Sequence, residues 1–319
     1  MNDYSFGFKP VDDESEIIAH VANGNYKGNS IYLNKKSVSD INNDKIELLY
    51  DYVMDNKIRI PQRKLEKVAK AVELEQEPFE TDLRSLYRSF MDSLKHSNEI
   101  SLRDSELEVV PYQGDEENIQ RDVMFVSACS GAGKTTFISN YCKYFNKLFK
   151  TSPIYLFSCK PLSDERAYED VKRIKQVPMT EDNLQDLVDN GGYKNFVSKS
   201  GRSLVIFDDF DAVDKKIEKL MDVLLNSVLQ VGRSKRVYCI VSKHSLNAGH
   251  KTKIIWSEAN KIVLFPNGLS RYSLVYAMKN YLGFDQKMID KILSHKSRWV
   301  VVHNHMPKYF ITQNSLSLL

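Results

Sequence analysis

Residues 122–145 read DVMFVSACSGAGKTTFISNYCKYF, and this stretch decides the expected fold. An apolar run ends in a glycine-containing turn, after which apolar residues recur every three or four positions as far as Phe145. Such a strand–turn–helix unit places the turn at a helix N-terminus, where backbone N–H groups favour an anion. The segment ACSGAGKTT, residues 128–136, therefore predicts a phosphate-binding loop with Ala128 in place of the first glycine.

The residue types of this loop match the binding of a nucleoside triphosphate with Mg²⁺. Gly131 and Gly133 let the backbone turn tightly, so that its N–H groups face the phosphates. Lys134 is expected to neutralise the β- and γ-phosphates, and Thr135 to bind Mg²⁺. The predicted nucleotide-binding residues are Ser130, Gly131, Ala132, Gly133, Lys134, Thr135 and Thr136.

A second motif, LVIFDD at residues 204–209, is a strand that ends in two acids. When such a strand delivers carboxylates beside a phosphate loop, one acid can hold Mg²⁺ through water and the other can polarise the attacking water. We expect Asp208 to serve the metal and Asp209 to activate water, while Asp211 is interpreted as a bystander or a helix cap.

Short apolar runs alternate with amphipathic helical patterns after residue 115, which predicts a covered, mainly parallel sheet flanked by helices. The five runs are DVMFVSA (122–128), PIYLFSC (153–159), SLVIFDD (203–209), RVYCIVS (236–242) and KIVLF (261–265). The fold class is thus an α/β P-loop NTPase, of the kind with an extra strand between the loop strand and the acidic strand. Helices at 269–282 and 286–294 and a final strand pair are expected after it.

The first part of the chain follows a different pattern. Two short strands are predicted within residues 10–38, and helices around 45–54, after Pro61 and around 81–94. An acidic, aperiodic connector then suggests a boundary near residue 115. The predicted division is a mostly helical N-terminal accessory region, 1–115, and an ATPase core with a basic C-terminal part, 116–319.

The reaction class follows from the acids and from motifs that the sequence lacks. No NKxD-type reader of guanine follows the loop, and no arginine-rich lid indicates a small-molecule kinase. ATP hydrolysis by a motor or switch fits better. Arg233, after Gly232, could reach the γ-phosphate of a neighbouring subunit, or could belong to an exposed basic turn. One of Ser242, Lys243 and His244 could sense the γ-phosphate, and the sequence does not decide which.

Charge is distributed unevenly along the chain. The formal net charge is +3, but residues 231–319 hold 14 Lys and Arg against 3 Asp and Glu. Such a basic region indicates contact with a polyanion, and double-stranded DNA is the predicted partner through backbone contacts. The candidate DNA-binding residues are Lys235, Arg236, Lys251 and Lys253.

The expected location follows from cysteine spacing and hydropathy. The 4 cysteines form no CxxC pair, which favours a reducing compartment over a disulfide framework. No apolar stretch approaches the roughly 20 residues of a membrane span, and the polar start does not resemble a signal peptide. We expect a protein without a membrane span that is not secreted.

The order of these motifs, from ACSGAGKTT through LVIFDD and VGRSKRVYCIVSKHS to SEANKIVLFPN, resembles the genome-packaging ATPases of large DNA viruses and their virophage and polinton-like relatives. Those proteins are members of the FtsK/HerA superfamily of DNA-pumping P-loop motors. The similarity spans about residues 122–281. By position, Lys134 and Thr135 match the family's phosphate-loop pair and Asp208 and Asp209 its acidic pair. Arg233 matches its Gly-Arg, and Ser242 or His244 its strand-ending polar residue.

The resemblance implies an ATP- and Mg²⁺-dependent motor, built as a homo-oligomeric ring, that pumps double-stranded DNA into a viral capsid. It also implies a capsid or portal-vertex partner and a location in the virion or at the assembly site in the host-cell cytoplasm. Two alternatives stay open. One is a helicase-like or AAA+ ATPase in viral replication, and the other is an NTP-dependent assembly switch without translocation.

Overall fold

The computed structural model describes residues 4–8, 10–23, 27–35, 40–55, 58–74, 76–95, 99–101, 109–111, 113, 121–210, 213–247 and 249–319. The chain divides into two compact units. The first comprises Met1–Val109 with Ser315–Leu318, and the second comprises Val110–Asn314 with Leu319. The assignment of an accessory region and an ATPase core stays a prediction.

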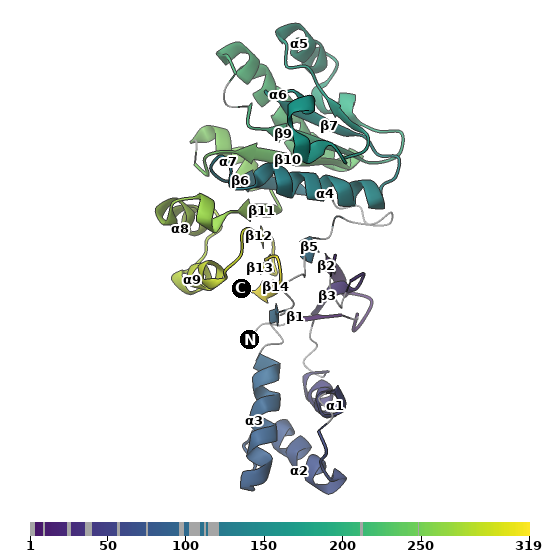
Figure 1. Cartoon of the computed structure of the whole chain (residues 1–319), viewed down its shortest axis with the longest axis vertical. Helices are drawn as coiled ribbons and strands as arrows, with labels where there is room; N and C mark the ends of the chain where they lie inside the picture. The colour runs from purple at the N-terminus through teal and green to yellow at the C-terminus, as the bar shows by residue number, and fades with distance from the viewer. Residues whose placement is uncertain are drawn as a thin grey trace. The chain divides into compact units, whose positions relative to one another are not determined.

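The second unit is built on a mixed sheet (Figure 1). Its strands lie in the order β13 (Tyr309–Ile311), β12 (Val300–His303), β11 (Lys261–Leu264), β6 (Val123–Ser127), β10 (Val237–Lys243), β9 (Ser203–Asp208), β7 (Ile154–Ser158) and β8 (Ile174–Gln176). The strands from β11 to β8 run parallel, while β12 and β13 are antiparallel to their neighbours. The predicted α/β class and all five predicted parallel strands are confirmed, and β10 is the extra strand between the loop strand and the acidic strand.

The strand register brings the ends of these strands to one edge. Asp208 of β9 lies beside Ser242 of β10 and Ser158 of β7, and Lys243 of β10 lies beside Ser127 of β6. Residues that directly follow β6, β9 and β10 therefore emerge together, although β6 ends at Ser127 and β10 ends at Lys243. The carboxyl edge of a parallel sheet is where such folds bind ligands.

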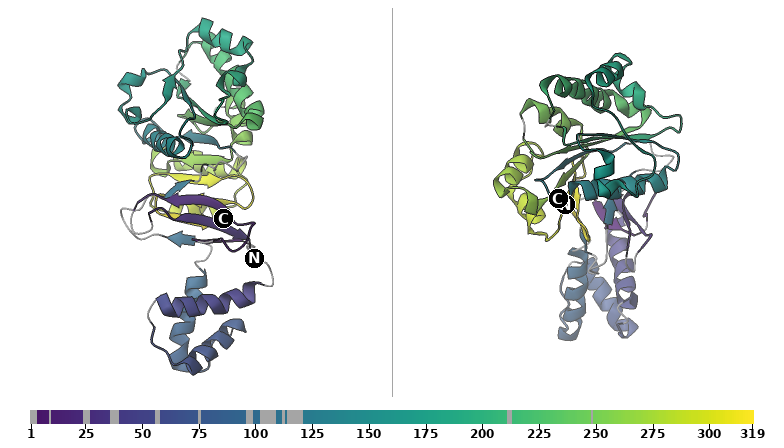
Figure 2. Two further views of the ribbon diagram at one scale, coloured as in Figure 1. Left: turned by 90° about the vertical axis from the view of Figure 1, so that its right-hand side faces the viewer. Right: turned by 45° about the horizontal axis from the view of Figure 1, so that its top comes forward.

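Helices cover both faces of this sheet because its strands are apolar on both sides. The helix α4 (Lys134–Leu148) packs on one face, where Phe145 lies edge-on to Tyr238 with ring centroids 5.3 Å apart. The other face is covered by α5 (Glu181–Asp189), α6 (Lys215–Val231), α7 (His250–Glu258), α8 (Arg271–Asn280) and α9 (Gln286–Ser294). Figure 2 shows α4 and the green helices on opposite sides of the sheet.

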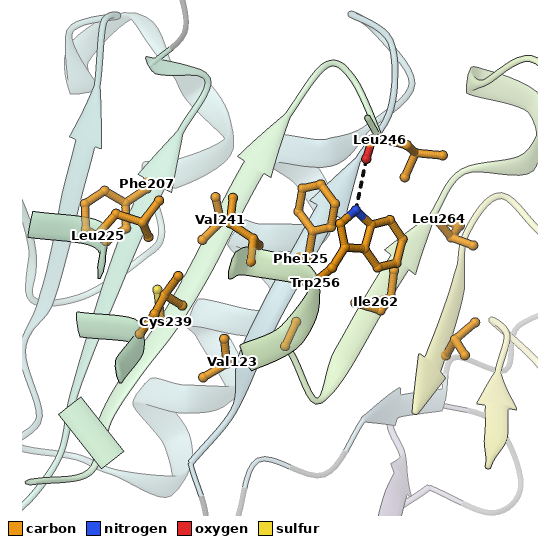
Figure 3. Packing of buried hydrophobic residues seen from close by; sticks show 14 of the residues in the cluster. Val123, Phe125, Phe207, Leu225, Cys239, Val241, Leu246, Trp256, Ile262 and Leu264 are labelled. Carbon is orange, nitrogen blue, oxygen red and sulfur yellow. Dashed lines mark hydrogen bonds between the residues drawn. The ribbon is translucent and has the colours of Figure 1, made fainter. Parts of the chain in front are cut away.

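The core on the second face is closely packed (Figure 3). Phe125 of β6 lies edge-on to Trp256 of α7, with ring centroids 5.2 Å apart. The indole N–H of Trp256 donates to the carbonyl of Leu246 at 3.0 Å, so the buried ring keeps its hydrogen bond. This bond ties α7 to the segment that follows β10. Short 3₁₀ helices complete the unit: Leu162–Asp164, Arg166–Tyr168, Gly192–Phe196, Gly232–Lys235 (η6) and Pro266–Gly268 (η7).

The first unit contains an antiparallel sheet and a helical group. In the sheet, β3 (Ser30–Lys35) lies between β1 (Tyr4–Gly7) and β2 (Glu16–Val21). The strand β4 (Glu99–Ser101) pairs antiparallel with β14 (Ser315–Leu318), and β5 (Val109–Pro111) lies where the chain passes from the first unit to the second. The helices α1 (Asp40–Asp55), α2 (Gln62–Glu73) and α3 (Thr81–Lys95) bury Leu49, Val68 and Phe90 against one another. None of the described helices is long and apolar enough to cross a lipid bilayer.

A buried polar cluster lies near the amino end of β6. Lys261 donates to Asp122 at 2.6 Å, and the hydroxyl of Tyr141 donates to the other oxygen of the same carboxylate at 2.6 Å. His303 pairs with Lys261 across β11 and β12 and stacks on Tyr309, with ring centroids 4.6 Å apart. Burial, and then the positive charge of Lys261, lowers the pKa of His303 to about 4.

This pKa predicts a loss of stability in mild acid. The folded protein keeps His303 neutral, whereas the unfolded chain binds a proton near pH 6.5, so the free energy of unfolding falls as pH drops below that value. Between pH 7 and pH 5 we expect the native protein to lose about 1–2 kcal/mol more than a His303→Phe variant, which keeps the stack but cannot titrate. Urea unfolding at both values measures this, and equal losses in the two proteins would contradict it.

Candidate functional site

The predicted phosphate loop adopts a tight turn between β6 and α4. Gly131 and Gly133 have φ values of 78° and 108°, in the left-handed region that glycine adopts without strain. Gly133 is the N-cap of α4, and Lys134 is the first helical residue and is buried. Thr135 is half-buried, while Ser130 and Thr136 are exposed. The backbone thus has the form that the sequence predicts, and a nucleotide-binding role for its residues stays a prediction.

The loop rests on a second turn that the sequence analysis did not single out. The N–H of Cys129 donates to the carbonyl of Gly268, in the 3₁₀ turn η7 after β11, at 2.9 Å. A Cβ on Gly268 would lie 2.7 Å from the Cβ of Ala132, so only glycine permits this approach. The turn after β11 therefore helps to set the position of the phosphate loop at the carboxyl edge of the sheet.

Lys134 joins the loop to the acidic strand. Its ammonium donates to the carbonyl of Ala128 at 2.9 Å and lies 3.2 Å from Oδ2 of Asp209. It also lies 3.0 Å from Nδ1 of His244, whose Nε2 is 3.2 Å from the same carboxylate oxygen. These distances fit a neutral imidazole whose Nδ1 accepts from Lys134 and whose Nε2–H donates to Asp209, a tautomer inferred from the contacts. Lys134, Asp209 and His244 form one connected cluster.

The two acids differ in environment. Asp208 is the last residue of β9 and is 6% exposed, and this burial raises its pKa, with a further contribution from Asp209. Its Oδ1 is buried without a hydrogen-bond partner. Asp209 is partly exposed and has φ of 44°, a left-handed conformation that costs about 1–2 kcal/mol for a residue with a side chain. A buried carboxylate oxygen with no donor fits a cation or its water, because an unpaired buried charge is costly.

The residues at the end of β10 separate into different contacts. The hydroxyl of Ser242 donates to Oδ1 of Asp209 at 3.4 Å, and His244 reaches the same carboxylate. The ammonium of Lys243 instead lies 4.4 Å from the centre of the Phe210 ring. Of the three sensor candidates, Ser242 and His244 thus contact the acidic pair, and the sensor role itself stays a prediction. Asp211 lies outside the described residues.

Arg233 lies away from this cluster. It is exposed in η6, which precedes β10, whereas Lys134 and Asp209 lie at the far end of that strand. A seven-residue strand spans about 20 Å, so Arg233 does not join the site of its own chain. Position 232 needs glycine for a different reason, which is close packing. A Cβ there would lie 2.5 Å from Nη1 of Arg121, and this nitrogen donates to the carbonyls of Val228 and Val237 at 2.7 Å each.

The remaining predicted residues and one unpredicted residue can also be placed. Lys235 and Lys253 are exposed, Arg236 is partly exposed, and the side chain of Lys251 lies outside the described residues. Arg298 was not predicted, yet its Nε donates to the carbonyl of Ala132 in the phosphate loop at 3.1 Å. A single arginine more than 160 residues beyond the loop carries no sequence signal for this contact.

The approach of Gly268 to the loop generates a test. A Gly268→Ala variant should push the loop at Ala132 and weaken binding of a fluorescent ADP analogue about tenfold, since overpacking costs about 1–3 kcal/mol. Adding Ala132→Gly removes the clashing Cβ and should restore most of the affinity. Binding titrations of both variants and of Ala132→Gly alone complete a double-mutant cycle. Additive effects would show that the two residues do not touch as described.

No protein-family model matches the chain. An uncharacterised protein of Sputnik virophage, V3, is 29% identical over 231 residues, which are 72% of this chain and 87% of the relative. The sequence is thus similar to that of a virophage protein.

Solved structures with a similar arrangement include B204, the DNA-packaging ATPase from Sulfolobus turreted icosahedral virus. It is 16% identical, with a TM-score of 0.40, and the match covers 57% of this chain and 92% of that one. The genome-packaging NTPase B204 of Sulfolobus turreted icosahedral virus 2 with ATP-gammaS is 12% identical, with a TM-score of 0.39 and coverage of 62% and 96%. The pCW3 conjugation coupling protein TcpA is 13% identical, with a TM-score of 0.43 and coverage of 93% and 76%. These solved structures are similar to this chain in the arrangement of the fold alone.

Proposed function

We propose that this protein is an ATPase that drives double-stranded DNA into a viral capsid during virion assembly. The observation that carries the proposal is the cluster of Lys134, Asp209 and His244 at the carboxyl edge of the sheet, beside the buried Asp208. The phosphate loop, an acidic pair and a polar strand end converge there from three neighbouring strands. A site that only bound a nucleotide would not require a second carboxylate.

The residues of the site fit ATP with Mg²⁺. The loop from Ser130 to Thr136 offers its N–H groups to the phosphates, and the hydroxyl of Thr135 with the partnerless oxygen of Asp208 would hold the metal ion directly or through water. When bound, Mg²⁺ supplies charge neutralisation on the phosphate oxygens. The orphaned oxygen of Asp208 is the observation that favours a cation at this place.

Lys134 and Asp209 then have coupled tasks. In the structure the ammonium of Lys134 neutralises Asp209. When Lys134 turns to a phosphate, Asp209 remains held by His244 and Ser242 and can accept a hydrogen bond from a water molecule. His244 contacts both Lys134 and Asp209, so its hydrogen bonds would change when Lys134 moves from Asp209 to a phosphate. Hydrolysis in this scheme depends on the carboxylate that the loop lysine releases.

DNA is the proposed substrate of the motor, for two reasons. The basic last 89 residues suit phosphate contacts, whose affinity falls with salt and ignores base sequence. The packaging ATPases that the sequence resembles pump double-stranded DNA. Lys235, Arg236 and Lys253 are the proposed contacts within the described side chains. The capsid or its portal vertex is the proposed docking partner, and the virion or the assembly site in the host-cell cytoplasm the proposed location.

The first test is ATP hydrolysis with and without long double-stranded DNA at low and moderate salt. We expect stimulation by DNA that declines as salt rises, and no hydrolysis by Lys134→Ala. Turnover that is indifferent to DNA would favour the alternative of an assembly switch. Hydrolysis by Lys134→Ala would show that the phosphate loop is not the site. Unwinding of a forked duplex would favour the helicase alternative.

A second test concerns the proposed homo-oligomer. Because Arg233 lies at the opposite edge of the sheet from its own Lys134, we propose that it completes the site of a neighbouring copy in a ring. An Arg233→Ala variant should lose at least a hundredfold in hydrolysis and keep its unfolding temperature and nucleotide affinity.

Mixing two inactive variants distinguishes action in trans. Arg233→Ala supplies an intact phosphate loop, and Lys134→Ala supplies an intact Arg233, so mixed assemblies should recover part of the hydrolysis. Lys235→Ala, assayed without DNA because Lys235 is a proposed DNA contact, is the matched control, since it removes one charge from the same turn. Recovery that is absent under conditions where the two variants co-assemble would contradict action between copies.

A further inference from the structure

Arg298 lies in a rigid connection beside the phosphate loop. The connection joins α9 to β12, and the hydroxyl of its buried Ser297 donates to the carbonyl of Trp299 at 2.7 Å. The ring of Trp299 packs edge-on against Phe137 in the first turns of α4, with centroids 5.1 Å apart. The N–H of Arg298 donates to Oε1 of Gln313 at 3.1 Å. The backbone of Arg298 is therefore anchored to α4, the helix that follows the phosphate loop.

The side chain of Arg298 is exposed, but its guanidinium covers the loop. Nε donates to the carbonyl of Ala132 at 3.1 Å. A Cβ on Gly133 would lie 2.8 Å from Nη2 and 3.0 Å from Cζ, so the cation rests directly on the residue that caps α4. In the described part of the chain, neither Nη group makes a hydrogen bond and no acid forms an ion pair with Arg298.

This placement is electrostatically unfavourable without an anion. A helix N-terminus carries partial positive charge, so it repels a cation placed there. Lys134, the other cation of the loop, already has a carboxylate partner in Asp209. A second and independent sign of a ligand is the partnerless oxygen of Asp208, which is buried at the same edge. The free donors of Arg298 are arranged as a fork that suits phosphate oxygens.

We propose that Arg298 binds the α- and β-phosphates of the nucleotide held on the loop of its own chain. Lys134 reaches toward the acidic pair, where the γ-phosphate would react, while Arg298 lies against Ala132 and Gly133, the two residues that precede Lys134 in the loop. Of these two cations, Lys134 is paired with Asp209, whereas the guanidinium of Arg298 has donors to offer to the phosphates nearer the start of α4. The inference rests on the proposed nucleotide site and adds to it a residue that binds the diphosphate group common to ATP and ADP.

This role has a kinetic signature. A contact with the α- and β-phosphates exists before and after hydrolysis, so it stabilises bound ATP and bound ADP equally. Losing it should raise KM and the dissociation constant of ADP while kcat changes little. Loss of the Asp209 carboxylate is expected to lower kcat and to change the dissociation constant of ADP little, because its task is confined to the chemical step.

The test is equilibrium binding of a fluorescent ADP analogue to the full-length protein with Mg²⁺ and without DNA. Arg298→Ala should weaken binding about ten- to a hundredfold, as expected for one charge-assisted hydrogen-bond pair. Arg298→Lys should recover part of the loss. Lys296→Ala, which removes one exposed charge two residues away, should bind as the native protein does. AMP lacks the β-phosphate. As a competitor, it should therefore show a smaller difference in affinity between Arg298→Ala and the native protein than ADP shows.

The outcomes separate the inference from the proposed function. Arg298→Gln places an amide N–H where Nε lies and so keeps a donor for Ala132 while removing the charge. Native affinity in this variant would show that Arg298 acts only by bracing the loop and would overturn the inference. If Arg298→Ala bound ADP with native affinity and Lys134→Ala did not bind it, the inference would also be overturned, and the proposed nucleotide site would stand. Native affinity in Lys134→Ala would instead overturn the proposed nucleotide site.

Discussion

The backbone pairing of β10 between β6 and β9 is the constraint on which the site depends. Parallel hydrogen bonding in this register sets Ser242 beside Asp208 and Lys243 beside Ser127. The loop after β6 and the acids after β9 are thereby held on the two sides of one strand. The 3.2 Å approach of Lys134 to Asp209 follows from that spacing. A slip of one residue in β10 would turn its side chains to the other face and separate Ser242 from the acids.

Several groups at this edge of the sheet are held in energetically unfavourable states. Asp208 is buried with an unpaired oxygen, Asp209 has a left-handed backbone, and Arg298 is a cation at a helix N-terminus. Each feature costs free energy in the chain by itself, and a ligand of opposite charge relieves the two that are electrostatic, at Asp208 and Arg298. The surrounding core is large and apolar and keeps these groups in place. The proposed site for an anionic nucleotide and a divalent cation accounts for the two electrostatic features together.

The sequence predicted the fold well where a pattern is local. Apolar runs identified the parallel strands β6, β7, β9, β10 and β11, and the glycine spacing identified the turn before α4. It could not identify contacts between distant segments that leave no pattern. The approach of Gly268 to Ala132 and the reach of Arg298 across the loop depend on how β11 and β12 stack beside β6. The short strand β8 and the return of Ser315–Leu318 to the first unit escaped for the same reason.

The central claim is that hydrolysis at the Lys134–Asp209 edge moves the protein along duplex DNA. Displacement of a triplex-forming strand from a long duplex tests it most directly, because a protein that tracks along the duplex strips the third strand without unwinding. We predict displacement with ATP, none with a non-hydrolysable analogue and none by an Asp209→Asn variant that still binds nucleotide. Rapid hydrolysis on DNA without displacement of the third strand would contradict the claim.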